Sequence, residues 1–267
     1  MDAGVFFLYT GAMPLSWGFR TQLKFFGIFA AAIFIIVGAL VYFLWPAPTC
    51  FDNRQNQDEE GVDCGGANCL PCANKISELN ILWTRTIKIS DGVYDVAALL
   101  ENANQFLSAK YISYIIKLYD SNNILVALKE NSTFIYPGEK FVIFEPSIST
   151  QNRIPVRALL EIDRSSLLWE KAESKPLKID ILRSQKFLDE GMLLPARVET
   201  EIKNMSNLLY RNIQVIAVLW GGAGDVLGVS RTIIEKMDID ESKTITFTWP
   251  KAIPGVDRVE IFLRQVP

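Results

Sequence analysis

Histidine is absent from this sequence of 267 residues. Its absence excludes Ser-His-Asp and Cys-His nucleophile activation, histidine-ligated zinc and any imidazole proton relay. The chain also lacks a cluster of lysine and arginine, and its formal net charge is -3, so no electrostatic feature indicates a nucleic-acid partner. No motif for paired-carboxylate hydrolysis or for a Ser-Lys pair stands out. The sequence therefore predicts a protein that is not an enzyme and that needs no cofactor.

A glycine-rich phosphate loop is missing as well. Gly221, Gly222 and Gly224 are the nearest approach to one, but Asp225 and a strand-like run follow them. This order is typical of a hairpin turn rather than of a nucleotide-binding loop.

One long apolar run, Phe25 to Trp45, dominates the N-terminal part and contains no charged residue. At about 1.5 Å per residue, a helix of this length reaches about 30 Å, which matches the hydrocarbon core of a bilayer. A buried core helix of a soluble protein is the alternative, yet polar residues at helical spacing are absent. The sequence predicts a transmembrane helix at 25–45 in contact with membrane lipid. The preceding cytoplasmic tail covers 1–24, and its first nineteen residues are expected to form a loose cytoplasmic or interfacial segment.

The charges on either side of this run predict its orientation. Arg20 and Lys24 precede it, whereas Arg54 is the only base among the acidic residues that follow, which are Asp52, Asp58, Glu59, Glu60 and Asp63. The positive-inside bias then places the N-terminus in the cytoplasm and the C-terminal domains outside it. A cleavable signal peptide has a shorter apolar core, and a lipoprotein cut before Cys50 needs a small residue just ahead of it. We therefore expect an uncleaved signal anchor and a single-pass protein of the cell membrane.

All four cysteines fall in one short segment, at Cys50, Cys64, Cys69 and Cys72. In an oxidising compartment they form two disulfides, and a segment with so few apolar residues needs such cross-links. In a reducing compartment four thiolates hold zinc, and Cys69-x2-Cys72 is one normal half of such a site. The predicted topology favours disulfides in a Cys-rich stalk, 46–75. Three pairings stay open.

The same segment, CFDNRQNQDEEGVDCGGANCLPC, resembles a short Cys-rich signature that recurs in prokaryotic and some other surface proteins. One extra residue lies between Gly66 and Cys69. The match is carried by Cys50, Asp52, Asn56, Gln57, Glu59, Gly61, Val62, Asp63, Cys64, Gly65, Gly66, Cys69 and Cys72. The resemblance implies a cell-surface setting and no activity.

Acidic and amide side chains of this segment are candidate calcium ligands, namely Asp52, Asn56, Asp58 and Asp63. The EF-hand spacing is not met, because Arg54 stands where a ligand would be. A solvated acidic face is the alternative. The sequence therefore predicts no metal site of a known type.

From Lys75 onward, apolar residues recur with the period of two that is typical of half-buried strands. Turn signals separate them at Asp91-Gly92, Ser121-Asn122-Asn123 and Pro137-Gly138. The predicted strands are 94–101, 111–119, 156–162, 197–203, 212–219, 244–249 and 258–264. Many short strands with frequent turns predict antiparallel β-sandwiches. Leu167 to Ala172 is expected to form a turn or two of helix or to lead into the next strand.

Weak self-similarity at an offset of roughly one hundred residues indicates a duplicated domain. The paired landmarks are Asn102 with Asn204, Leu118-Tyr119 with Leu219-Trp220, and Phe144-Glu145-Pro146 with Thr248-Trp249-Pro250. The sequence predicts one β-sandwich at 76–165 and a second at 166–267.

The stretch Ile116-Lys117-Leu118-Tyr119-Asp120 resembles the signature of the FxLYD domain, with Ile116 in place of the Phe. The resemblance covers roughly Ser77 to Asp163. It implies a small immunoglobulin-like β-sandwich of bacterial and archaeal envelope proteins, with no known catalytic residues. The predicted fold is then an all-β ectodomain of two tandem immunoglobulin-like sandwiches after one transmembrane helix and a Cys-rich stalk.

Several aromatic and polar residues invite a binding role. Trp249 shares the apolar face of its strand and is expected in the core, whereas Trp220 is expected to be partly exposed at a domain or partner contact. Trp83 and Trp169 complete the set that a carbohydrate-stacking platform would use. Asn131 and Asn204 begin N-glycosylation acceptor patterns, whose use depends on the host.

These features predict a membrane-anchored, surface-displayed, non-catalytic binding or structural protein of the cell envelope. Its partner is expected to be a protein or a glycan outside the cytoplasm. The alternative is an accessory subunit of a membrane secretion, pilus or transport assembly, in which the span itself makes specific contacts.

Overall fold

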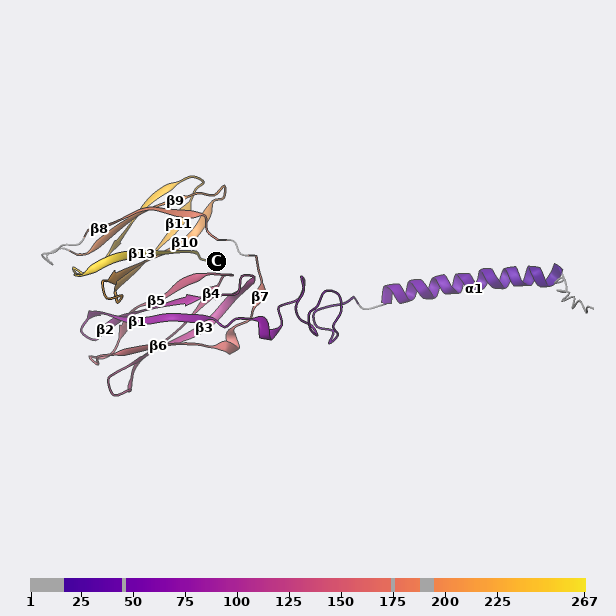
Figure 1. Ribbon diagram of the computed structural model, residues 1–267, viewed down its shortest axis with the longest axis horizontal. Coiled ribbons are helices and arrows are strands. Elements are labelled where there is room, and N and C mark those ends of the chain that lie inside the picture. Colours follow the sequence, from indigo (N-terminus) through magenta and orange to yellow (C-terminus); the bar gives the residue numbers. More distant parts are fainter. Residues whose placement is uncertain (1–16, 45–46, 174–175, 188–194) are drawn as a thin grey trace, which may run out of the picture. The chain divides into compact units, whose positions relative to one another are not determined.

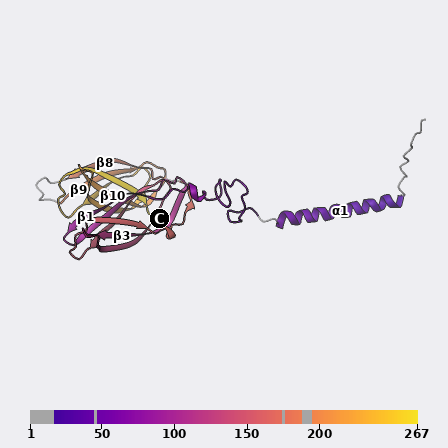
Figure 2. The same cartoon turned by 60° about the horizontal axis from the view of Figure 1, so that its bottom comes forward.

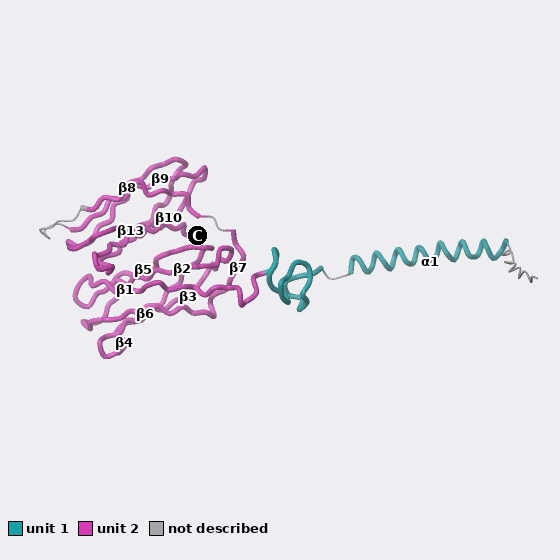
Figure 3. Tube along the Cα trace, viewed as in Figure 1, with its two compact units in different colours: residues 1–69 teal, residues 70–267 magenta. Residues whose placement is uncertain are grey.

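The computed structural model describes residues 17–44, 47–173, 176–187 and 195–267, and the predictions for the first sixteen residues and for Trp45 lie outside this part. The chain divides into two compact units, Met1–Cys69 and Leu70–Pro267 (Figure 3). We describe each unit by itself.

The first unit contains one long helix, α1, from Trp17 to Leu44. None of its side chains is buried, and it is long and apolar enough to cross a membrane. It begins at Trp17 rather than at Phe25, so Arg20 and Lys24 lie in its first turns. The prediction of a loose tail is corrected at 17–19, which are helical. The apolar run continues the helix because nothing between Phe25 and Leu44 competes for its backbone hydrogen bonds.

The second unit is built almost entirely of antiparallel strands, which fall into a first half, β1 to β7, and a second half, β8 to β13 (Figure 1). A short 3-10 turn, Ala73–Lys75, precedes the first half. The first-half strands are β1 Asn80–Ser90, β2 Val93–Glu101, β3 Leu107–Tyr119, β4 Leu125–Ile135, β5 Lys140–Ser149, β6 Arg157–Ile162 and β7 Glu170–Lys171. The second-half strands are β8 Ile179–Phe187, β9 Arg197–Asn204, β10 Tyr210–Gly221, β11 Val226–Met237, β12 Ser242–Thr248 and β13 Val256–Gln265.

Each half consists of two sheets with the same strand order. In the first half the orders are β1-β2-β5 and β4-β3-β6, with β7 paired to the start of β3. In the second half they are β8-β9-β12 and β11-β10-β13, so the sixth strand of each half returns to the third. Between the halves, 164–166 forms a 3-10 turn and 170–171 pairs as β7, which settles the stretch 167–172 in favour of a lead into a strand.

The alternation seen in the sequence places one face of each sheet in a core. Val96, Ile116 and Phe141 belong to a buried cluster that both sheets of the first half share. Val198, Leu219 and Phe247 belong to the equivalent cluster of the second half. These two clusters hold each half together by burial of apolar surface.

The turns joining β1 to β2, β3 to β4, β4 to β5 and β10 to β11 lie where the sequence predicts them. At the last of these, Gly221 N–H donates to the Asp225 carbonyl over 2.8 Å, and Gly224 has a φ of +79°. The glycine there permits a left-handed backbone, which closes a hairpin and forms no phosphate loop.

A buried asparagine marks the end of β2 and, at the equivalent place, the end of β9. Asn102 Nδ2 donates to the carbonyls of Leu107 and Tyr136, both over 2.8 Å, while its Oδ1 accepts the Asn104 N–H over 3.0 Å. Asn204 Nδ2 likewise donates to Leu208 and Asp238, at 2.8 and 2.9 Å, and its Oδ1 accepts the Ser206 N–H over 3.0 Å. We call each arrangement an asparagine corner.

The two corners show that Asn102 and Asn204, the first pair of landmarks, occupy equivalent positions in the two halves. Tyr119 and Trp220 also occupy equivalent positions, since each pairs with the first residues of the following strand and with an arginine of the sixth strand. The third landmark is displaced by two residues: Phe144 pairs with Ala97, and the equivalent strand pairing in the second half involves Thr246 rather than Thr248.

The four sheets of the second unit lie in layers, in the order β4-β3-β6, β1-β2-β5, β11-β10-β13 and β8-β9-β12 (Figures 1 and 2). A third apolar cluster joins the two middle sheets. Its buried members are Ile87, Ala97, Leu99, Val142, Phe144, Ile216, Val218, Trp220, Val226 and Val229. The middle sheets are therefore buried on both faces, and the two halves share apolar surface instead of being joined only by the chain.

Candidate functional site at the junction of the two halves

The junction between the two β halves contains buried aromatic and charged residues. Trp220 is 7% exposed and packs edge-on against Trp83, with ring centroids 5.4 Å apart. Its Nε1 donates to Glu260 over 2.9 Å, and the Arg258 guanidinium lies 4.6 Å from its ring centroid. Trp220 is thus at a domain contact as predicted, but it is buried rather than partly exposed.

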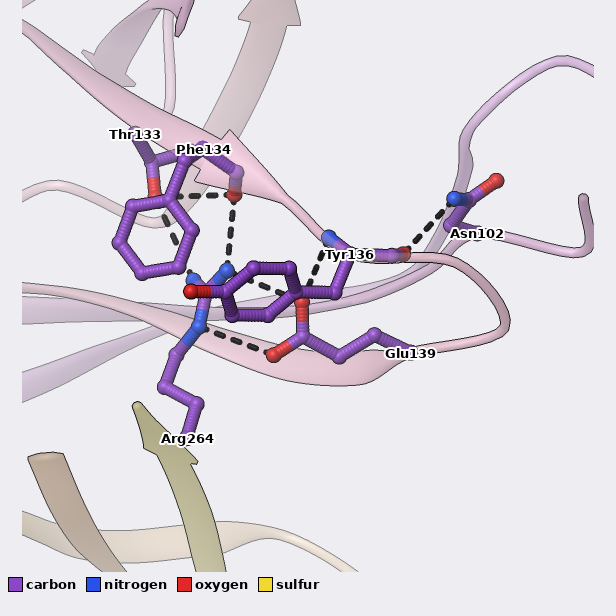
Figure 4. Close-up of polar contacts among 6 residues, drawn as sticks. All are labelled: Asn102, Thr133, Phe134, Tyr136, Glu139 and Arg264. Carbon is purple, nitrogen blue, oxygen red and sulfur yellow. Dashed lines mark hydrogen bonds and ion pairs between the residues drawn. The ribbon is translucent and has the colours of Figure 1, made fainter. Parts of the chain in front are cut away.

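Arg264, on β13, is the polar centre of the junction. It is 7% exposed and reaches from the second half to three groups of the first half (Figure 4). Its Nη2 donates to the Phe134 carbonyl over 2.8 Å and to Glu139 Oε2 over 3.0 Å, and its Nη1 donates to Thr133 Oγ1 over 3.3 Å. Its Nε lies 3.0 Å from Glu139 Oε1, an ion-pair contact without the directionality of a hydrogen bond.

Aromatic rings enclose the same guanidinium. Its central carbon lies 3.9 Å from the Phe134 centroid and 4.3 Å from the Phe141 centroid, distances typical of cation–π contacts. Tyr136 closes the group: its backbone N–H donates to Glu139 Oε2 over 3.1 Å (Figure 4). We call Thr133, Phe134, Tyr136, Glu139 and Arg264 the arginine cluster.

Burial dominates the electrostatics of this cluster. It raises the pKa of Glu139 above the ordinary value, and the charge of Arg264 and the Tyr136 amide counteract only part of that effect. A guanidinium stays protonated in proteins, so Arg264 supplies the fixed positive charge of this pair. Glu139 is already engaged on both oxygens, and this arrangement suits the joining of strands better than proton transfer.

A cavity of about 640 Å³ lies beside the arginine cluster. Its lining includes Tyr136, Glu139 and Arg264 of the cluster together with Leu177 and Ile179. This volume falls within the range of small-molecule sites, and the walls combine apolar surface with the charged residues Lys110, Glu139, Glu173 and Arg264. The geometry allows an apolar group to be held there.

The sequence alone did not identify Arg264 or Glu139. Arg264 counted as a member of the polar face of its strand, and its partners lie 125 to 131 residues away in the chain. No local pattern encodes a pairing over such a separation. The one available signal was that Ala97 and Leu99, opposite the core-facing residues of β2, are also apolar, which indicates a second buried face.

The Cys-rich segment contains two disulfides. Cys50 is bonded to Cys69, with Cα atoms 5.5 Å apart. Cys64 and Cys72 are disulfide-bonded as well, so none of the cysteines is free. Cys69 Sγ lies 3.2 Å from Glu59 Oε1, but a disulfide sulfur carries no proton and donates no hydrogen bond. The structure therefore has disulfides in place of the zinc-bound thiolates that the sequence left as an alternative.

The acidic residues of the segment hold its backbone. Asp63 Oδ1 accepts the N–H groups of Asp52 and Asn53, at 2.9 and 3.0 Å. Asp52 accepts from the Asn56 side chain over 2.8 Å, which is the main cause of its lowered pKa, and Asp58 accepts the Ala67 N–H. Carboxylates used in this way stabilise turns. Calcium binding by Asp52, Asn56, Asp58 and Asp63 stays a prediction.

The two glycosylation candidates differ in access. Asn131 is exposed on β4 and its Nδ2 donates to Glu145 Oε1 over 2.7 Å. Asn204 is 0% exposed, and both of its amide hydrogens are engaged in the corner of β9. The folded chain therefore presents Asn131, and not Asn204, to a modifying enzyme.

The remaining tryptophans do not form one platform. Trp249 is 5% exposed and belongs to the core of the second half, as predicted. Trp83 belongs to the cluster between the halves, and Trp169 packs against the core of the first half. Trp169 also lines a cavity of about 610 Å³ together with Leu79, Ile81 and Leu167.

No protein-family model and no curated protein matches this chain. Chains of solved structures do match, among them the crystal structure of red sea bream transglutaminase, with 13% identity over 72% of this chain and a TM-score of 0.25. This chain spans 30% of that one. The resemblance is a distant one between β-rich domains, and nothing about activity follows from it. The Cys-rich signature and the FxLYD resemblance stay predictions.

Proposed function

We propose that this protein is a non-catalytic binding or structural protein displayed outside the cytoplasm on a single membrane anchor. α1 serves as an uncleaved signal anchor, with Arg20 and Lys24 near its cytoplasmic end. The two β halves form the displayed part. They are tandem immunoglobulin-like sandwiches of the FxLYD type, with the second sandwich more divergent than the first.

One observation carries this proposal: a fully exposed apolar helix is followed, within a few residues, by a segment whose four cysteines are all in disulfides. The helix alone fits a signal peptide as well as an anchor. Disulfides persist in oxidising compartments and are rare in reducing ones, so they support an extracytoplasmic location. The matching strand orders of the two halves and their shared buried cluster support a rigid displayed body.

The full chain, expressed in cells and purified from their membranes, tests the proposal by mass. Alkylation of free thiols in denaturant is expected to add nothing without reductant and four groups with reductant. The mass is also expected to include the residues of α1, because an anchor is not cleaved. Four reactive thiols with one bound zinc, or loss of α1, would contradict it.

Protease added outside intact cells is expected to remove the β halves and to leave α1 in the membrane. Replacement of Phe25–Leu44 by an unrelated apolar helix is expected to leave display unchanged. Loss of stable display after that exchange would instead favour the accessory-subunit alternative, because there the span makes specific contacts.

A further inference from the structure

The outer face of the sheet β4-β3-β6 is free, although its equivalent in the second half is buried. The strand pairing within each half shows that Ile115, Lys117 and Tyr119 of β3 are equivalent to Ile216, Val218 and Trp220 of β10. In β10 these three side chains are 0–7% exposed, because the sheet β1-β2-β5 covers them. In β3 the same three positions are only partly buried.

The free face keeps much of the character of its buried equivalent. Leu125, Leu128 and Leu159 are 44%, 47% and 42% exposed, and each lies beside Lys117 or Tyr119 in the strand pairing. The Arg157 guanidinium lies 5.0 Å from the Tyr119 centroid, as Arg258 lies over Trp220. We call Ile115, Lys117, Tyr119, Leu125, Leu128 and Leu159 the outer apolar face.

The other free sheet face of the unit, on β8-β9-β12, has a different composition. Its residues can be compared with those at equivalent positions on the covered face of β1-β2-β5. Glu199 and Glu201 of β9 are equivalent to Ala97 and Leu99 of β2. Thr244 and Thr246 replace Val142 and Phe144. Glu199 and Glu201 form ion pairs with arginines at the surface. Covering this face desolvates those carboxylates, so head-to-tail stacking of chains through it is unfavourable.

We infer that the outer apolar face binds the same face of a second copy of this chain, in a two-fold symmetric dimer. Its equivalent within the chain is already a sheet-to-sheet interface, so the surface suits packing against another sheet. Its charges balance: Lys117 and Arg157 are offset by Glu130 and Glu161, and Lys117 and Glu161 are paired over 2.6 Å. A charge-balanced face meets its own copy without like-charge repulsion, and a two-fold axis closes the assembly.

The size of the face sets the strength of the dimer. Three strands about 4.8 Å apart, with about six residues of 3.3 Å rise, cover about 300 Å² of flat surface. Stable complexes bury about 800 Å² per partner, so association in solution is weak. Anchoring, which the proposed function supplies, holds copies in one membrane and raises their effective concentration. The dimer therefore forms mainly between anchored chains.

Pulsed electron spin resonance on the full chain in phospholipid vesicles tests this dimer. A spin label at Asn122→Cys lies in the exposed turn between β3 and β4, at the rim of the face. A discrete distance is expected, whose weight grows with the protein-to-lipid ratio. The same label at Thr246→Cys, on the far sheet of the unit, is expected to give a different and longer distance.

Leu128→Glu in the labelled chain is expected to weaken the association at least tenfold, since the two-fold axis brings two carboxylates into the contact. The fold tolerates this change, because residue 128 is half exposed and pairs with Lys117. Ile239→Glu is the matched control: it lies in the turn after β11, is 54% exposed and leaves the dimer unchanged.

A wild-type chain without a discrete distance at any density overturns the dimer, as does a distance that Leu128→Glu leaves intact. The measurement is repeated at high concentration in detergent solution, so that it does not depend on insertion. A chain that inserts in the bilayer and stays monomeric refutes the dimer alone. A chain that fails to enter vesicles refutes the anchor, and thereby the proposed function.

Discussion

Glu139 and Arg264 show how a single buried pair can fix the arrangement of two β bodies. The desolvation of both charges is costly, and the cluster offsets it with two contacts from Arg264 to the carboxylate and with hydrogen bonds to Thr133 and Phe134. Such a pair contributes little net stability compared with well-packed apolar residues. It does require one placement of β13 against the turn that precedes β5, because a shift of one residue would separate the two buried charges.

Stability is expected to depend on pH through Glu139, in a direction that follows from its raised pKa. The folded chain binds this proton more tightly than the unfolded chain, so the contribution of Glu139 is greatest below the ordinary pKa of 4.5 and is lost as the pH rises through the folded value. The free energy of unfolding of the wild type minus that of Glu139→Gln should therefore decrease over this window.

Urea unfolding at a series of pH values from 4 upward measures this difference. The subtraction matters because Asp91 and Asp163 have lowered pKa values and act in the opposite direction. A difference that increases with pH would mean that attraction to Arg264 outweighs burial.

At the scale of strands and turns, the asparagine corners connect local sequence to sheet topology. Asn102 and Asn204 are 1% and 0% exposed, and each bonds the end of one strand to two other segments of its half. The amide replaces missing backbone partners where the chain leaves one sheet for the other. The same device recurs at the equivalent place in both halves, whose strand orders agree.

Asn102→Ala and Asn204→Ala are each expected to lower the free energy of unfolding by about 3 kcal/mol, because carbonyls and an N–H group lose their partner in a buried place. Denaturant unfolding followed by tryptophan fluorescence measures the effect. Asn122→Ala, in an exposed turn, serves as the control and should stay within about 0.5 kcal/mol of the wild type. Equal stability of all three variants would show that the corners are dispensable.

How far the sequence predicts these elements depends on how each strand is buried. Strands with one solvated face, such as β9, alternate clearly and were located from the pattern alone. β4 and β1 are edge strands with exposed residues on both sides, and β5 is buried on both faces, so neither kind shows a simple alternation. The start of α1 at Trp17 was missed because helices extend past the apolar run wherever nothing ends them.

The same reasoning applies to the site. The four cysteines and their disulfide state followed from composition and topology, whereas the Cys50–Cys69 pairing did not, because spacing leaves the pairings equivalent. The arginine cluster depends on contacts between residues more than a hundred positions apart, and only the structure brings them together.

At the scale of the whole second unit, the shared cluster makes the halves depend on each other. Separation would expose Leu99, Phe144 and Val218 to water at the same time. The free energy of that exposure couples the two cores, so we expect the unit to unfold in one transition although it contains a duplicated architecture.

Val218→Lys introduces at this interface the residue found at the equivalent position of β3, Lys117. Val218 is 0% exposed and pairs with Glu260, whose carboxylate already accepts the Trp220 Nε1–H, so a lysine there buries an ammonium group in the apolar interface beside a carboxylate that is already engaged. We expect a loss of about 3 kcal/mol and separate melting of the two halves in scanning calorimetry. Thr246→Lys, on the outer face of β12, is the control and should melt as the wild type does. A single unchanged transition in Val218→Lys would argue against a shared core.

All four cysteines lie within 50–72, so the end-to-end length of this one segment depends on whether its disulfides are formed. In the oxidised chain the Cα atoms of Cys50 and Cys69 lie 5.5 Å apart, although nineteen positions separate them. After reduction the same segment can extend to about 60 Å. The β halves contain no cysteine, so we expect them to keep their fold after reduction. The redox state of the surroundings would then set how far the folded halves can stand from α1.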